Sequence, residues 1–241
     1  MSDRRLQELN ILRASIDNLY ENGPHYSVKD IRGQRLFKAD TLVSFRGTDF
    51  KSLGDIEFLA QVNAPSHFEP PTTHPDILNA FQSIPSNARH IVVTGHSAGA
   101  FKARALVDMI RSKGLQATYV GFNGEVPFAA RNYVAPLERN DKIIRSSSEW
   151  ITNPEANPGM AKTYTYDYGS IISPMQSHTA QSLITGLRRI PQQTRTVVGM
   201  VRDVVKQGFF TAYRYGSKAV RSVLAFGARI IPRRFARYGS R

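Results

Sequence analysis

The feature that most constrains this fold is a short apolar run that leads through a glycine-flanked serine into a helical pattern. Residues 91–94 read Ile-Val-Val-Thr, a β-branched run typical of a strand buried on both faces. Gly95-His96-Ser97-Ala98-Gly99 follows, and residues 98–113 then repeat apolar side chains at helical spacing up to Gly114. A strand, a sharp turn and a helix in this order predict one crossover unit of a parallel sheet.

Further strands and helices alternate along the chain. Helical spacing is found in residues 5–21 and 75–84, and extended runs in residues 35–38, 41–45, 90–94, 117–122, 133–137 and 163–168. We therefore expect an α/β fold in which helices flank a mostly parallel central sheet. No apolar stretch reaches the roughly 18 residues of a membrane-spanning helix, and the chain begins with a polar helical pattern instead of a standard signal peptide.

The positive charge of the chain is concentrated near its end. The whole chain has 32 basic and 19 acidic residues, a formal net charge of +13. Residues 188–241 hold 13 of the basic residues and one acidic residue, a net of +12, whereas residues 1–187 carry only +1. Apolar residues recur at helical spacing opposite the basic ones in residues 194–210 and 217–231. We expect one folded domain over 1–187 and a basic amphipathic helical tail over 188–241. Such a tail would bind an anionic surface. In the alternative interpretation, its apolar stripes pack on the domain as core helices.

The pentapeptide Gly95–Gly99 fits G-x-S-x-G, the nucleophile elbow. In that motif a strained turn raises the serine hydroxyl above the sheet, and small neighbours avoid clashes at the bend. The helix that follows directs backbone N–H groups and the positive end of its dipole toward a developing oxyanion. We therefore expect Ser97 to be a nucleophile. The competing interpretation is a turn of small residues with a surface serine.

A nucleophilic serine needs a base, and a histidine base needs a carboxylate that orients it. Elbow hydrolases place these groups in the chain order serine, acid, histidine, and His178 is the only histidine after Ser97. We expect Asp141 to be the acid, because it begins a turn after the extended run 133–137. The competing role for this residue is capping of that turn. The alternatives for the acid are Asp167 and Glu138.

Two motifs taken together resemble a known family. Phe45-Arg46-Gly47-Thr48 begins 50 residues before Gly95-His96-Ser97-Ala98-Gly99, and this pair resembles the fungal-type class 3 lipases of the α/β-hydrolase fold. Residues 121–127 resemble the strand end that the family places after the elbow helix, and Asn140-Asp141 occupies the place of its catalytic aspartate. The resemblance covers residues 35–185.

The resemblance implies a role for five residues. Ser97 would be the nucleophile, Asp141 the orienting acid and His178 the base. Thr48 would provide one oxyanion contact through its backbone N–H and hydroxyl, and the backbone N–H of Ala98 would provide the other. Residues 49–62 match the position of the lid helix that uncovers the site at a lipid surface.

We therefore expect a serine carboxylic-ester hydrolase that acts on lipid esters, as a lipase or a phospholipase of the A type. Residues 188–241 would hold it on an anionic membrane, which favours phospholipids over storage fats and a peripheral-membrane or cytoplasmic location. No H-E-x-x-H, P-loop or dinucleotide fingerprint is present and the chain has no cysteine, so neither a metal nor another cofactor is expected.

Two other functions fit the same residues. One is a hydrolase scaffold with little or no catalysis, whose tail binds nucleic acid or membrane. The tail segment 233–238 interleaves arginines with aromatic residues, as contact with phosphates and stacking on bases require. The other is a non-lipid esterase, a thioesterase or a peptidase, since all of these share the elbow.

Overall fold

The computed structural model describes residues 3–34, 37–48, 71–124, 134–146, 159–166 and 188–189. The chain divides into two units, residues 1–190 and 191–241, and every described residue belongs to the first. The helices are α1 (Asp3–Asn22), the short 3₁₀ helix η2 (Pro71–Thr73), α3 (Pro75–Gln82) and α4 (Ala98–Ser112). The strands are β1 (Tyr26–Asp30), β2 (Thr41–Phe45), β3 (His90–His96), β4 (Gln116–Phe122), β5 (Lys142–Ser146), β6 (Lys162–Tyr166) and β7 (Arg188–Arg189).

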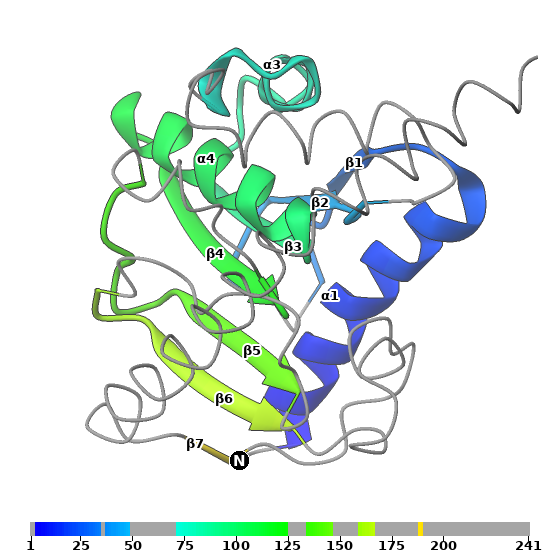
Figure 1. Ribbon diagram of the computed structural model, residues 1–241. Helices are drawn as coiled ribbons and strands as arrows, with labels where there is room; N and C mark the ends of the chain where they lie inside the picture. Colours follow the sequence, from blue (N-terminus) through cyan, green and yellow to red (C-terminus); the bar gives the residue numbers. More distant parts are fainter. Residues whose placement is uncertain are drawn as a thin grey trace, which may run out of the picture. The chain divides into compact units, whose positions relative to one another are not determined.

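The described strands form one seven-stranded sheet in chain order, from β1 to β7 (Figure 1). Strands β2 to β6 run parallel to one another, while β1 and β7 pair antiparallel at the two edges. The predicted α/β fold with a mostly parallel sheet is therefore confirmed. Because β2 to β6 are parallel, their carboxyl ends all lie along the same side of the sheet, perpendicular to the strands. We call this side, where these strands end, the carboxyl edge.

Helices cover both faces of this sheet (Figure 1). Successive residues of a strand point to opposite faces. In β3, Ile91 and Val93 belong to the hydrophobic cluster formed with α3 and α4, whereas Val92 belongs to the cluster formed with α1. The uninterrupted apolar run of β3 thus reflects burial on both faces, as the sequence predicts.

Most of the predicted elements in the described part of the chain are found within a few residues of their expected bounds. Two observed strands, β1 and β5, were not predicted, and two predicted strands are not observed in their described residues. The edge strand β1 was not predicted, because it has exposed charged residues at its end and lacks an apolar pattern. Residues 134–137, the described part of the predicted run 133–137, form no strand, and β5 follows them instead. Residues 37 and 38, the described half of the predicted run 35–38, are likewise not in a strand.

The tail and the proposed lid segment lie outside the described residues, except that β7 comprises residues 188 and 189. These two residues pair with Thr165 and Tyr164 of β6. Among the described helices, none has the length and hydropathy needed to cross a bilayer.

Candidate active site

Ser97 occupies the turn between β3 and α4 in a strained backbone conformation. Its φ of 54° and ψ of −127° fall where residues with a side chain are rarely found. Its backbone N–H donates to the carbonyl of Phe122 at 3.1 Å, and its carbonyl accepts from the N–H of Ala100 at 3.0 Å. The turn is therefore fixed both to β4 and to the first turn of α4. This is the geometry that the G-x-S-x-G motif requires.

The two glycines of the motif are required by close backbone contacts. A Cβ on Gly95 would lie 2.2 Å from the carbonyl oxygen of Gly99. A Cβ on Gly99 would lie 2.2 Å from the carbonyl oxygen of Arg46. Real Cβ atoms essentially never approach other atoms this closely, so both positions accept only glycine without rearrangement. The contact of Gly99 with Arg46 also joins the elbow to the segment that follows β2.

That segment, Arg46-Gly47-Thr48, lies directly against Ser97 and is here called the oxyanion turn, after the role that the resemblance implies for Thr48. A Cβ on Gly47 would lie 2.9 Å from the Cβ of Ser97, so this glycine allows the turn to approach the serine. Thr48, the next residue, is half-buried, and Ala98 is the first residue of α4. The structure thus brings three of the five predicted site residues, Ser97, Thr48 and Ala98, into one small region at the carboxyl edge.

Tyr20 near the end of α1 also belongs to this region, although no sequence motif indicates a role for it. Its hydroxyl lies 2.7 Å from the backbone nitrogen of Gly47 and 2.9 Å from Nδ1 of His96. Burial raises the pKa of Tyr20 to about 12, against smaller opposing effects of the Gly47 hydrogen bond and of Arg13 and Arg46. The only sequence signal was its place in the helical pattern of α1, which cannot show a contact 76 residues away.

Asp141 does not lie near Ser97. It precedes β5, and β5 is parallel to β4 and pairs Phe122 with Ile144, while β3 pairs His96 with the same Phe122. Asp141 is therefore level with Tyr119, four residues back along β4 from the position beside Ser97. At about 3.3 Å per residue this separates the two along the strands by about 13 Å.

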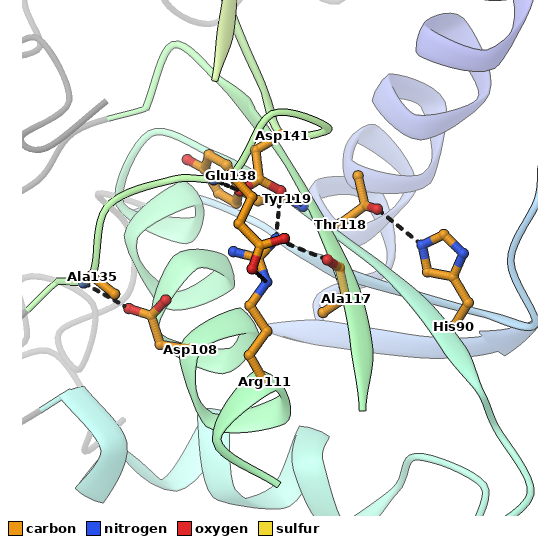
Figure 2. A network of polar contacts seen from close by, with 9 residues as sticks. All are labelled: His90, Asp108, Arg111, Ala117, Thr118, Tyr119, Ala135, Glu138 and Asp141. Atoms are coloured by element: carbon orange, nitrogen blue, oxygen red, sulfur yellow. Dashed lines mark hydrogen bonds and ion pairs between the residues drawn. The ribbon is translucent and has the colours of Figure 1, made fainter. Parts of the chain in front are cut away.

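The carboxylate of Asp141 is instead the centre of a buried polar cluster at the amino ends of the strands (Figure 2). It is fully buried and accepts hydrogen bonds from Nη2 of Arg111 at 2.8 Å, the N–H of Tyr119 at 2.8 Å and the N–H of Glu138 at 2.7 Å. Arg111 also donates to the carbonyl of Ala117 and pairs with the carboxylate of Glu138.

The structure therefore does not place Asp141, the predicted triad acid, or its alternative Glu138 beside Ser97. A strand was expected before Asp141, which would have placed that residue at a carboxyl end. The strand follows Asp141 instead, so the carboxylate lies at the opposite edge. The predicted base His178, the alternative acid Asp167 and the lid segment 49–62 lie outside the described residues.

A second polar cluster at the carboxyl edge ties α3 to the elbow helix. The carboxylate of Asp76, in the first turn of α3, accepts from Nζ of the buried Lys102 of α4 at 2.7 Å and lies 3.1 Å from Nδ1 of His25. Burial would raise the pKa of Asp76, but the hydrogen bond and charge of Lys102, helped by His74 and His25, hold it below its ordinary value. The backbone N–H of Arg46 donates to the carbonyl of His25, so this cluster adjoins the oxyanion turn.

Within the described part of the chain, no group of three or more carboxylate and histidine side chains is arranged to hold a metal ion. The described site therefore consists of a strained serine, a helix N-terminus and a backbone turn packed on that serine. No protein-family model matches this chain, and a search of curated proteins finds no significant relative.

Proposed function

We propose that the chain is a serine carboxylic-ester hydrolase of the α/β-hydrolase type that acts on lipid esters. The observation that carries this proposal is the strained backbone of Ser97 at the end of β3, with Gly47 of the oxyanion turn packed against its Cβ. A residue held in a rare conformation costs on the order of 1–3 kcal/mol, and such strain is concentrated at functional sites. A turn that served only to connect β3 to α4 would not need it.

In this proposal the reaction has two steps. The hydroxyl oxygen of Ser97 bonds to the acyl carbon while its proton passes to His178, and the ester C–O bond then breaks as the leaving alcohol takes that proton. Water adds to the acyl group in the same way, and the carboxylic acid leaves as Ser97 regains its proton. The N–H groups of Thr48 and Ala98, with the dipole of α4, stabilise the oxyanion formed in each step.

The acid that orients His178 has to come from another carboxylate at the carboxyl edge. Glu149 comes three residues after the end of β5, and Asp167 comes directly after β6; both lie outside the described residues. A serine–histidine–carboxylate relay spans two hydrogen bonds of about 2.8 Å and one imidazole ring. Strands two apart are separated by about 10 Å and strands three apart by about 14 Å. Because β5 is two strands from β3 and β6 is three, the span favours Glu149.

The lipid character of the substrate rests on the paired motifs Phe45–Thr48 and Gly95–Gly99 and on the charge of residues 188–241. A polycation of +12 concentrates the enzyme at an anionic bilayer, where each basic residue near the surface contributes about 1 kcal/mol. Phospholipids in such a bilayer are then the substrates most available to the site. The proposal thus names an A-type phospholipase or lipase.

The first test is labelling of the full chain with a fluorophosphonate, followed by mapping of the modified residue. We expect modification of Ser97 alone, and we expect Ser97→Ala to lower ester hydrolysis by a factor on the order of 10⁵ or more. Ser112→Ala is the matched control, because Ser112 is the last residue of α4, at the opposite end from Ser97, and its hydroxyl donates to the carbonyl of Met109. Equal hydrolysis by wild type and Ser97→Ala would refute the proposal.

The second test concerns the substrate and the acid. Hydrolysis of phosphatidylglycerol vesicles is expected to exceed that of phosphatidylcholine vesicles and to fall with added salt. Glu149→Gln should lower kcat by a factor on the order of 10⁴, because the imidazole is no longer held in the correct tautomer, and Asp167→Asn should not. Binding of RNA or vesicles without any hydrolysis dependent on Ser97 would support the non-catalytic scaffold instead.

A further inference from the structure

The last turn of α1 places the hydroxyl of Tyr20 beside the oxyanion turn and the elbow. The apolar residues of α1 pack on the sheet in the cluster that contains Leu42 and Val92, and this packing places the end of α1 at the carboxyl edge. Tyr20, in the last turn of the helix, lies edge-on to the ring of His96 with 6.0 Å between ring centroids. Its hydroxyl is within hydrogen-bond distance of both the oxyanion turn and the elbow.

The direction of these hydrogen bonds follows from the groups involved. The backbone N–H of Gly47 can only donate, so the oxygen of Tyr20 accepts that bond. The phenol hydrogen is then available to Nδ1 of His96 when that nitrogen carries no hydrogen. With its pKa raised to about 12, the phenol keeps this hydrogen at any pH at which ester hydrolysis would be measured.

The packing around Gly47 leaves the turn little freedom. A Cβ on this glycine would lie 2.6 Å from the Tyr20 hydroxyl, 2.8 Å from the carbonyl oxygen of His96 and 2.9 Å from the Cβ of Ser97. The Tyr20 hydroxyl, the carbonyl oxygen of His96 and the Cβ of Ser97 therefore all lie close around the same position beside Gly47. The next residue is Thr48, whose N–H is a proposed oxyanion donor.

We propose that Tyr20 is a positioning residue for the oxyanion turn: its hydroxyl holds the N–H of Gly47 and the ring of His96, and so sets where the N–H of Thr48 points relative to Ser97. This inference rests on the proposed function. Without the hydroxyl, the buried N–H of Gly47 loses its partner, and the turn relaxes to recover one. Oxyanion donors act only when they are held in place before the charge develops, so a displaced Thr48 raises the barrier without weakening substrate binding.

The test compares Tyr20→Phe with wild type in the full chain, using a soluble p-nitrophenyl ester so that membrane binding plays no part. We expect kcat to fall about tenfold while KM stays within about twofold, a smaller loss than the 10²–10³ that follows removal of an oxyanion donor. Tyr26→Phe is the matched control. Tyr26 begins β1 at the carboxyl edge and packs against Phe45. Tyr26→Phe therefore also removes a tyrosine hydroxyl, but one without a role in the proposed site, and it should keep the activity of wild type.

A double-mutant cycle with Thr48→Val, which removes the Thr48 hydroxyl carried by the same turn and leaves its N–H in place, separates positioning from a general loss of structure. If Tyr20 acts through the turn, the loss of kcat in the double variant is smaller than the product of the two single losses. Independent, multiplicative losses, or a Tyr20→Phe variant as active as wild type, would overturn the inference while leaving the proposed function intact. If wild type neither hydrolyses the ester nor reacts with a fluorophosphonate at Ser97, the proposed function itself fails.

Discussion

Ser97 and Asp141 lie at opposite ends of the parallel strands of the same sheet. Ser97 follows the carboxyl end of β3, whereas Asp141 precedes the amino end of β5 and is fully buried beneath Arg111. The order of residues in the chain predicts that Ser97 and Asp141 share one triad. In the structure the two residues have separate surroundings. The first is held in a strained conformation at the proposed site, and the second holds three segments of the chain together by accepting their hydrogen bonds.

Asp141→Ala should therefore affect stability and not chemistry. The substitution leaves the Arg111 guanidinium and the N–H groups of Tyr119 and Glu138 without this partner, and we expect the free energy of unfolding to fall by about 3–5 kcal/mol. Urea unfolding measures this loss. Asp141→Asn should lose less, because its amide oxygen still accepts. A large fall in kcat with unchanged unfolding would show that Asp141 is catalytic after all.

Ser97→Gly should be more stable than Ser97→Ala by about 1 kcal/mol. Glycine adopts a φ of 54° without strain, whereas alanine keeps the strain, and the larger entropy of glycine in the unfolded chain offsets only part of the gain. Both variants lose the proposed nucleophile, so activity does not affect the comparison. Thermal unfolding of the two proteins in parallel measures the difference, and equal stabilities would mean that the turn is not strained in solution.

Gly99→Ala should disturb the elbow through its contact with Arg46. The new Cβ cannot fit 2.2 Å from a carbonyl oxygen, so the oxyanion turn and the elbow must separate. We expect a loss of stability of about 1–3 kcal/mol and at least about a tenfold slower reaction with a fluorophosphonate.

Gly114→Ala provides the control for Gly99→Ala. Gly114 has a φ of +76° and open space around its Cβ position, so alanine there costs about 1 kcal/mol through backbone strain alone. Its reaction rate with the fluorophosphonate should equal that of wild type. If Gly99→Ala reacts as fast as Gly114→Ala, the elbow tolerates a side chain at position 99.

Tyr20 should make the protein more sensitive to alkali. In the unfolded chain this phenol ionises near pH 10, but in the fold its pKa is about 12, so the folded state binds more protons between these values. The contribution of this pKa difference to the free energy of unfolding is fully present below pH 10. It falls by about 1.4 kcal/mol per pH unit as the pH rises toward 12. Tyr20→Phe lacks this dependence, and urea unfolding at several alkaline pH values compares the two. If the free energies of unfolding of wild type and Tyr20→Phe changed equally with pH, the pKa of Tyr20 would not be raised in the fold.

Asp76→Asn should remove an acid-sensitive contribution to stability. The pKa of Asp76 is lowered in the fold, so its contribution is present above the ordinary carboxyl pKa and is lost as the pH falls through the folded value. At neutral pH the substitution weakens the hydrogen bond from Lys102, at a cost of about 1–3 kcal/mol. The stabilities of wild type and Asp76→Asn should therefore converge as the pH falls. A difference that is constant from pH 7 to pH 3 would contradict this.

The local architecture around Ser97 could be predicted because it depends on neighbours in the chain. A β-branched run, a turn of small residues and a helical pattern specify their own backbone conformations over a few residues each. The strand β3, the elbow and α4 were accordingly predicted correctly. Short strands with weak patterns were not predicted. One example is β5, which has only Ile143 and Ile144 as apolar residues and becomes a strand by pairing with β4 and β6.

The α/β fold and the turn at Ser97 follow from patterns within short stretches of the chain, because local sterics and hydrogen bonding set the backbone conformation. Which side chains meet near Ser97 follows from the packing of the whole domain, which places Asp141 at the other end of the strands and brings Tyr20 from the first helix onto Gly47. The meeting of distant side chains depends instead on strand direction, on register and on how the helices pack. Placing a strand before Asp141 instead of after it is enough to move that residue from one end of the strands to the other.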